Sequence, residues 1–138
     1  MKKNLELNDT LNAYFLEIGK WSRFLGIVGY VGVGLLVLIS FTTPYFIKLS
    51  GASELAKIPS TTLSTVYFIL AGVYFYPVNY LYKFGTQIKI SLNNNDETTF
   101  LSAVKNLKSH YKFIGVFTLV LVSLYGFIFM MSLLSFFL

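Results

Sequence analysis

The sequence contains no cysteine and a single histidine, His110. Without cysteine, the chain cannot form disulfides, use thiolate chemistry or carry a lipid on sulfur. One histidine also excludes a multi-histidine metal site. His110 is the one candidate general base, and the sequence identifies no acidic or nucleophilic partner beside it. We therefore expect no catalytic residue, no metal site and no cofactor, and we predict that the protein is not an enzyme.

Charge is also scarce, since only 12% of the residues are charged, whereas soluble domains carry roughly 25%. Three stretches contain no Asp, Glu, Lys or Arg at all: 24–47, 58–82 and 113–138. A helix needs about 20 mostly apolar residues to cross a bilayer, and each stretch is long enough. The sequence therefore predicts an all-α integral membrane protein with three transmembrane helices.

We expect a single membrane domain over 1–138. Its predicted parts are an amphipathic interfacial helix at 1–22, transmembrane helices at 23–47, 62–82 and 113–138, an external loop at 48–61 and a cytoplasmic helical hairpin at 83–112. Ionisable residues inside a membrane usually mark ion pathways or proton relays, and none occurs in the three spans. This absence argues against a proton-coupled transporter or a voltage sensor.

The segment before the first span has apolar residues at helical spacing and polar residues on its other side. A helix of this kind lies in the headgroup plane with its apolar face toward the lipid, or it packs on the protein's own helices. The pattern leaves both interpretations open. Gly19 is a candidate hinge between this helix and the first span. The apolar residues are Leu7, Leu11, Tyr14, Phe15, Ile18, Trp21 and Leu25.

Residues 83–112 form the one sizeable polar segment between spans. The run Asn93, Asn94, Asn95 and Asp96 is typical of a turn followed by a helix cap. Apolar residues recur at helical spacing on both sides of this run, so we predict two antiparallel helical arms. The predicted contact stripes are Leu81, Phe84, Ile88 and Leu92 on the first arm, and Phe100, Val104, Leu107, Tyr111 and Ile114 on the second.

Two groups of residues inside the spans favour close packing of helices. Ser22, Gly26 and Gly29 fall near one face of the first span, and small residues let helix backbones approach each other in lipid. Pro77 and Asn79 lie near the inner end of the second span. They are interpreted either as part of a gate or ligand site or, as we prefer, as a kink with an interhelical hydrogen bond.

Basic residues set the predicted orientation. The net charge is +5, and nine Lys and Arg lie in 1–23 and 83–112, against two in 48–57. The positive-inside rule then places the N-terminus and the hairpin in the cytoplasm and the C-terminus outside. Because these residues flank apolar stretches, we interpret the excess as membrane topology and expect no nucleic-acid partner. Lys105, Lys108 and Lys112, with Trp21 and Arg23, form a candidate contact for anionic lipid or an acidic partner.

Several runs of residues carry a resemblance. They are Lys20, Trp21, Phe24, Leu25 and 27–29 at the first span, 80–84, Ile88 and Lys89, the turn at 93–96, 103–108, and 113–115. With these runs, the sequence resembles an uncharacterised family of small bacterial integral membrane proteins, classed as a domain of unknown function, and the resemblance extends over most of the chain. The resemblance implies a location in the bacterial inner membrane, and it implies no activity and no catalytic residues.

These observations predict a small non-enzymatic inner-membrane protein. We expect a scaffold, an accessory subunit or a lipid-organising protein that works as a homo-oligomer or with a larger membrane-protein partner. The alternative is an oligomeric channel or transport component, because three helices enclose too little volume for a pore in one copy.

Overall fold

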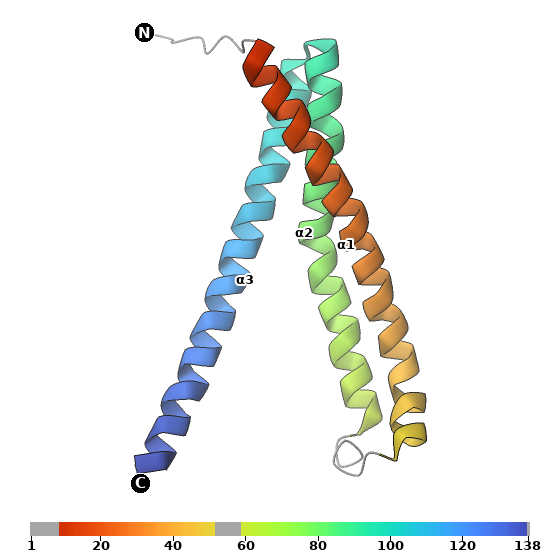
Figure 1. Ribbon diagram of the computed structural model, residues 1–138, viewed down its shortest axis with the longest axis vertical. Helices are drawn as coiled ribbons and strands as arrows, with labels where there is room; N and C mark the ends of the chain where they lie inside the picture. Colours follow the sequence, from red (N-terminus) through yellow and green to blue (C-terminus); the bar gives the residue numbers. More distant parts are fainter. Residues whose placement is uncertain (1–8, 52–58, 138) are drawn as a thin grey trace.

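The computed structural model describes residues 9–51 and 59–137, and three long helices contain nearly all of them (Figure 1). They are α1 (Asp9–Ser50, 42 residues), α2 (Ser60–Asn94, 35 residues) and α3 (Glu97–Phe137, 41 residues). The predictions of an all-helical chain and of three helices long and apolar enough to cross a membrane are confirmed for the described residues. At 1.5 Å per residue the helices span about 50–60 Å, which exceeds the roughly 30 Å hydrocarbon core of a bilayer.

The helices do not break at the boundaries expected between interfacial segments and spans. α1 runs without interruption through Gly19 and across the expected boundary at 22–23, so the structure has no hinge there. α2 and α3 likewise continue from the expected spans into the expected hairpin arms. Residues 1–8 of the predicted interfacial helix, 52–58 of the predicted loop and Leu138 of the third span lie outside the described residues.

α1 and α2 pack as an antiparallel pair along their length (Figure 1). Near one end Gly19 of α1 faces Ile88 of α2, and near the other end the Ser40 hydroxyl donates a hydrogen bond to the Ser64 carbonyl oxygen at 2.8 Å. Small residues of α1 lie buried on the side that faces α2, and they are Gly19, Ser22, Gly26 and Ser40. Close backbone approach is what stabilises helix pairs in an apolar solvent, so this pair has the packing expected of a membrane bundle.

A tight turn joins α2 to α3. Asn95 adopts a left-handed conformation (φ 49°) and Asp96 precedes the first turn of α3. The Asp96 carboxylate accepts hydrogen bonds from the backbone N–H groups of Thr98 (3.0 Å) and Thr99 (3.3 Å) and from both threonine hydroxyls. These bonds satisfy N–H groups that a helix start leaves without partners, and they reverse the chain within two residues.

Beside the turn, α2 and α3 enclose a small apolar core. Phe84 and Ile88 of α2 and Ala103 of α3 are fully buried, with Phe100 and Leu107 against them. The expected contact residue Val104 is 38% exposed, so that prediction was wrong and Ala103 takes its place. Ala103 has only a methyl side chain, which allows the α3 backbone to lie close to the large Phe84 and Ile88 side chains. Tyr111 and Ile114 of the predicted stripe are also exposed.

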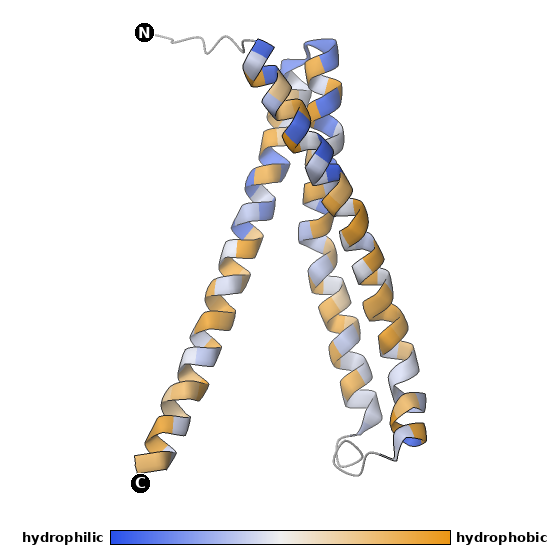
Figure 2. Ribbon diagram, viewed as in Figure 1, coloured by the Kyte–Doolittle hydropathy of each residue, from blue (hydrophilic) through white to orange (hydrophobic). Residues whose placement is uncertain are grey.

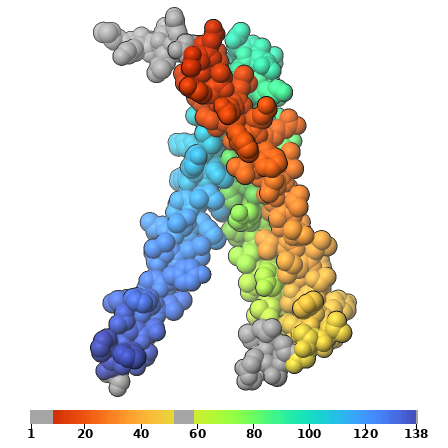
Figure 3. Space-filling model, viewed as in Figure 1, coloured from red at the N-terminus to blue at the C-terminus, as the bar shows by residue number. Residues whose placement is uncertain are grey.

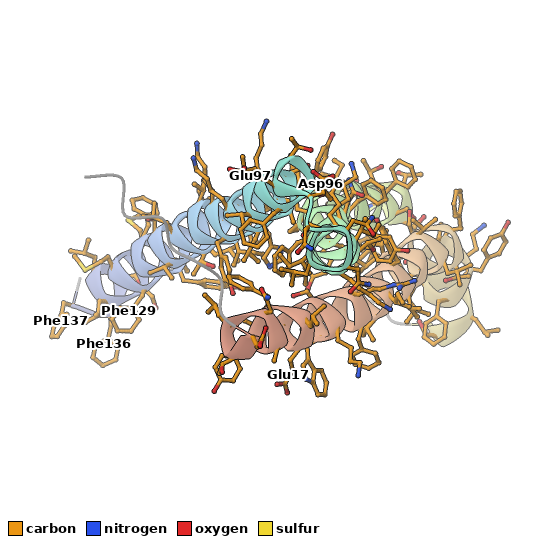
Figure 4. The ribbon with its side chains drawn as sticks, turned by 90° about the horizontal axis from the view of Figure 1, so that it is seen from above. Glu17, Asp96, Glu97, Phe129, Phe136 and Phe137 are labelled. Carbon is orange, nitrogen blue, oxygen red and sulfur yellow. The ribbon has the colours of Figure 1, made fainter. Side chains whose placement is uncertain are left out.

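Beyond this core, α3 diverges from the other two helices (Figures 1 and 3). Every residue from 118 to 137 is exposed, whereas α1 and α2 stay in contact. Figure 4 shows Phe129, Phe136 and Phe137 at the far end of α3, well away from α1 and α2. The molecule is therefore three helices thick only where the polar parts of the chain gather.

We call this region, residues 9–23 of α1 and 83–112 of α2 and α3, the polar end. Hydrophilic residues concentrate there, while the remaining helical lengths are mainly apolar (Figure 2). The α1 part of the polar end packs on the hairpin through Phe15, whose ring meets Phe100 edge-on at 5.5 Å between centroids. This ring contact is consistent with the interpretation that the N-terminal segment packs on the protein's own helices.

Candidate functional site

α1 and α2 approach each other closely along a seam. It is formed by Gly19, Ser22, Gly26 and Gly29 of α1 against Val78, Tyr82, Gly85 and Ile88 of α2. A Cβ atom on Gly26 would lie 2.8 Å from the Tyr82 Cβ, and one on Gly29 would lie 2.6 Å from a Val78 methyl group. Such separations are shorter than real Cβ contacts. Of the packing residues inferred from sequence, Gly26 and Gly29 thus lie where a larger side chain would separate the helices, and Ser22 is buried on the same face.

Two glycines of the seam, Gly19 and Gly85, were not among the packing residues inferred from sequence. A Cβ on Gly85 would lie 2.5 Å from the backbone nitrogen of Arg23 and 2.6 Å from the Gly19 carbonyl oxygen. The two backbones therefore touch at this point. The signal for Gly19 was its spacing of three, seven and ten residues from the other small residues, which continues one helical face.

Polar contacts tie the three helices together below the apolar core. The Tyr30 hydroxyl of α1 donates to the Asn79 side-chain oxygen of α2 at 3.0 Å. Pro77 is fully buried, and its carbonyl oxygen lies 2.8 Å from His110 Nδ1 of α3. The carbonyl cannot donate, so His110 presents an Nδ1–H here. Pro77 and Asn79 therefore occupy helix–helix contacts, and the sequence had not connected His110 with either.

A further polar contact lies between the hairpin arms. The Gln87 side-chain oxygen accepts hydrogen bonds from the Asn106 amide (2.7 Å) and the Ser102 hydroxyl (3.3 Å). These half-buried groups satisfy each other across the α2–α3 contact, which stabilises one register of the two helices.

The basic face consists of Lys105, Lys108 and Lys112, all of them exposed. At about 100° per residue, these lysines lie roughly 140–200° around α3 from the buried Ala103. The face therefore points away from α2. Among the described residues, no Asp or Glu forms an ion pair with these three lysines. Its position allows it to meet an external anion, and it equally suits a solvated helix surface.

Trp21 and Arg23 are exposed on α1, so they and the three lysines belong to different helices. Trp21 is 59% exposed and touches Phe24 of its own helix, at 6.0 Å between ring centroids. It lies roughly 160° around α1 from Gly19, on the side away from the seam. Glu17 also projects outward from α1 (Figure 4).

Two grooves open beside the hairpin. The first, which we call the α2–α3 groove, has a volume of about 450 Å³ and lies where α3 begins to leave α2. Its polar lining is Tyr80, Ser109 and Lys112, and its apolar lining is Phe113, Val116, Phe117 and Val120. The second, of about 620 Å³, lies between the start of α1 and the turn, and Asn12 Oδ1 is buried there without a hydrogen-bond partner among the described residues.

His110, the candidate general base, lines neither groove. The described ranges, 9–51 and 59–137, hold no cluster of three or more His, Asp or Glu side chains that could bind a metal ion. His110 Nδ1 is engaged by a backbone carbonyl, and its ring packs edge-on against Tyr111 at 5.5 Å. Both grooves combine apolar and polar lining residues.

Comparison with known proteins adds no relative: no protein-family model matches the chain, and no curated protein or solved structure matches it.

Proposed function

We propose that the chain is a non-enzymatic integral protein of the bacterial inner membrane that acts as a scaffold, accessory subunit or lipid-organising protein. The observation that carries this proposal is the exposure of α3, in which every residue from 118 to 137 is exposed and most are apolar. Exposing so long an apolar surface to water is strongly unfavourable, whereas lipid tails solvate it as well as a protein interior does.

In the proposed orientation the polar end lies in the cytoplasm and α3 ends outside. The nine basic residues of 1–23 and 83–112, against two in 48–57, support this orientation through the positive-inside rule. The hairpin from Lys83 to Lys112 would then rise about 18–24 Å from the bilayer, at 1.5 Å per residue. Such a projection provides a surface for a partner, which a purely embedded protein lacks.

The basic face indicates what kind of ligand this surface would bind. We expect Lys105, Lys108 and Lys112 to attract anionic lipid or an acidic partner, at about 1 kcal/mol per lysine close to an anionic surface. The attraction should weaken as salt is raised, because the Debye length falls from about 10 Å at 0.1 M to about 3 Å at 1 M. Trp21 and Arg23 would anchor α1 at the same membrane boundary.

Topology is tested by single-cysteine labelling, which is unambiguous because the chain has no cysteine. A membrane-impermeant maleimide should label Asn94→Cys only after the cells are permeabilised, and should label Leu138→Cys in intact cells. The exposed Ser50→Cys serves as the matched control for the opposite end of the α1–α2 pair, and should also react from outside. Labelling of Asn94→Cys in intact cells would contradict the proposed orientation.

The role is tested by mild-detergent purification followed by identification of co-purifying proteins and by flux measurements in liposomes. A stoichiometric membrane-protein partner, or a defined homo-oligomer without ion flux, supports the scaffold or accessory role. Neutralising all three lysines to Gln should lower binding to anionic vesicles while helical content stays unchanged. A robust proton- or sodium-coupled flux would contradict the proposal and favour the channel or transport alternative.

A further inference from the structure

The α2–α3 groove differs in composition from the seam, although both lie between long apolar helices. The α1 side of the seam is lined by glycines and serine, and at Gly85 of α2 the two backbones meet directly. The groove is instead lined by aromatic rings, and Phe113 and Phe117 stack at 6.4 Å with an interplanar angle of 15°. Bulky rings keep a second helix from approaching closely, and close approach is what stabilises helix pairs in lipid. A flexible acyl chain can fill such a groove, because it does not need a close contact between backbones.

The groove is also polar at one end only. Lys112 is the last charged residue of α3, and Ser109 and Tyr80 lie beside it in the lining, while the four remaining residues are apolar. From Lys112 to Val120 the lining extends over eight residue steps, or about 12 Å of helix. This length is close to the roughly 15 Å depth of one leaflet's hydrocarbon layer, half of the core thickness. An amphiphile with an anionic headgroup and an apolar chain about as long as one leaflet is deep matches the polar end and the apolar end of the groove.

We propose that the α2–α3 groove binds one anionic phospholipid, with its phosphate at Lys112 and an acyl chain along Phe113, Phe117 and Val120. The proposal rests on the proposed membrane location. It assigns one ligand to one site, the groove, whereas the basic face implies only a general attraction for anions. Lys112 supplies the positive charge, and the Ser109 and Tyr80 hydroxyls are available as hydrogen-bond donors to the headgroup oxygens. The lipid would thereby occupy the space that opens where α3 leaves α2.

The test is native mass spectrometry of the full chain released from micelles that contain phosphatidylglycerol or phosphatidylcholine. The wild-type protein should retain one phosphatidylglycerol in preference to phosphatidylcholine. Lys112→Gln should weaken this retention roughly five-fold, the equivalent of about 1 kcal/mol for one lysine near an anionic group. Lys105→Gln is the matched control, because Lys105 belongs to the basic face but not to the groove lining, and it should have a much smaller effect.

A second pair of variants tests the apolar part of the groove without changing charge. Val120→Trp fills the groove and should reduce phosphatidylglycerol retention, whereas Val122→Trp, at a 65% exposed position outside the lining, should not. Equal losses for Lys112→Gln and Lys105→Gln would overturn the groove site and leave the anionic-surface proposal intact. A lipid-free dimer as the dominant species would show that a second copy occupies the groove instead. A failure of the topology labelling, by contrast, would reject the proposed membrane orientation itself.

Discussion

Replacing Gly85 by alanine should weaken the α1–α2 pair. The effect should be larger than that of alanine at a glycine that faces only side chains or open space, because Gly85 faces backbone atoms. The new Cβ would lie 2.5 Å from the Arg23 backbone nitrogen, and ordinary contact begins at 3.4 Å. The helices would have to separate by about 0.9 Å, because the neighbours are backbone atoms that cannot rotate away. A gap of 0.5–1 Å forfeits roughly a quarter to a half of the dispersion energy of the atoms beside it.

Gly72→Ala in the same helix is the matched control, since a Cβ at Gly72 meets nothing within 4 Å. Both substitutions change the intrinsic helix preference by a similar amount, about 0.5–1 kcal/mol, so this contribution cancels in the comparison. The remaining difference is the cost of overpacking the seam, which is typically about 1–3 kcal/mol. We therefore expect Gly85→Ala to have a free energy of unfolding about 1–3 kcal/mol below that of Gly72→Ala.

The assay is reversible unfolding in mixed dodecylmaltoside and SDS micelles, followed by circular dichroism. Before SDS is added, both variants should have the helical content of the wild type, which shows that they fold and that the comparison is valid. Superimposable unfolding curves for Gly85→Ala and Gly72→Ala would refute the close backbone contact between α1 and α2.

Three further predictions concern the polar end. Leu107→Asp should lower the free energy of unfolding by about 1–3 kcal/mol, because it places a charge against the Phe84 and Ile88 core. Val104→Asp, at an exposed position, should have little effect. Equal effects of the two substitutions in thermal unfolding would contradict the observed orientation of α3. The hydrogen bonds from Thr99 and Thr98 lower the pKa of the Asp96 carboxyl to about 2 from 3.8, so the cap stabilises the folded state above pH 3.8 and this stabilisation is lost as the pH falls toward about 2. Asp96→Asn should therefore lose less thermal stability than the wild type between pH 5 and about pH 2, and parallel pH profiles would show that the carboxylate is not a cap. Phe84→Ala, at a fully buried position, should cost about 3–5 kcal/mol in the same unfolding assay, and a cost below about 1 kcal/mol would mean that the apolar core does not form.

The amino-acid sequence by itself determined the three helices of this protein. Charge-free stretches as long as 24–47 and 113–138 are long enough for helices that span an apolar layer, and hydropathy detects them because it depends on composition alone. The break between α2 and α3 also follows from composition, since four consecutive Asn and Asp residues at 93–96 favour a turn over a helix. Small residues at Ser22, Gly26 and Gly29 marked a face of α1 without identifying its neighbour.

Only the tertiary structure decided which faces meet. A stripe at spacings of three and four defines a helix face to within about one residue, or roughly 100°, so Val104 was chosen where the smaller Ala103 makes the contact. The contact between Gly85 and the Arg23 backbone, and the bond from His110 to the Pro77 carbonyl, join residues more than 30 positions apart, beyond the reach of any local pattern. The divergence of α3 was equally hidden, because an apolar side chain that faces lipid and one that faces another helix have the same hydropathy.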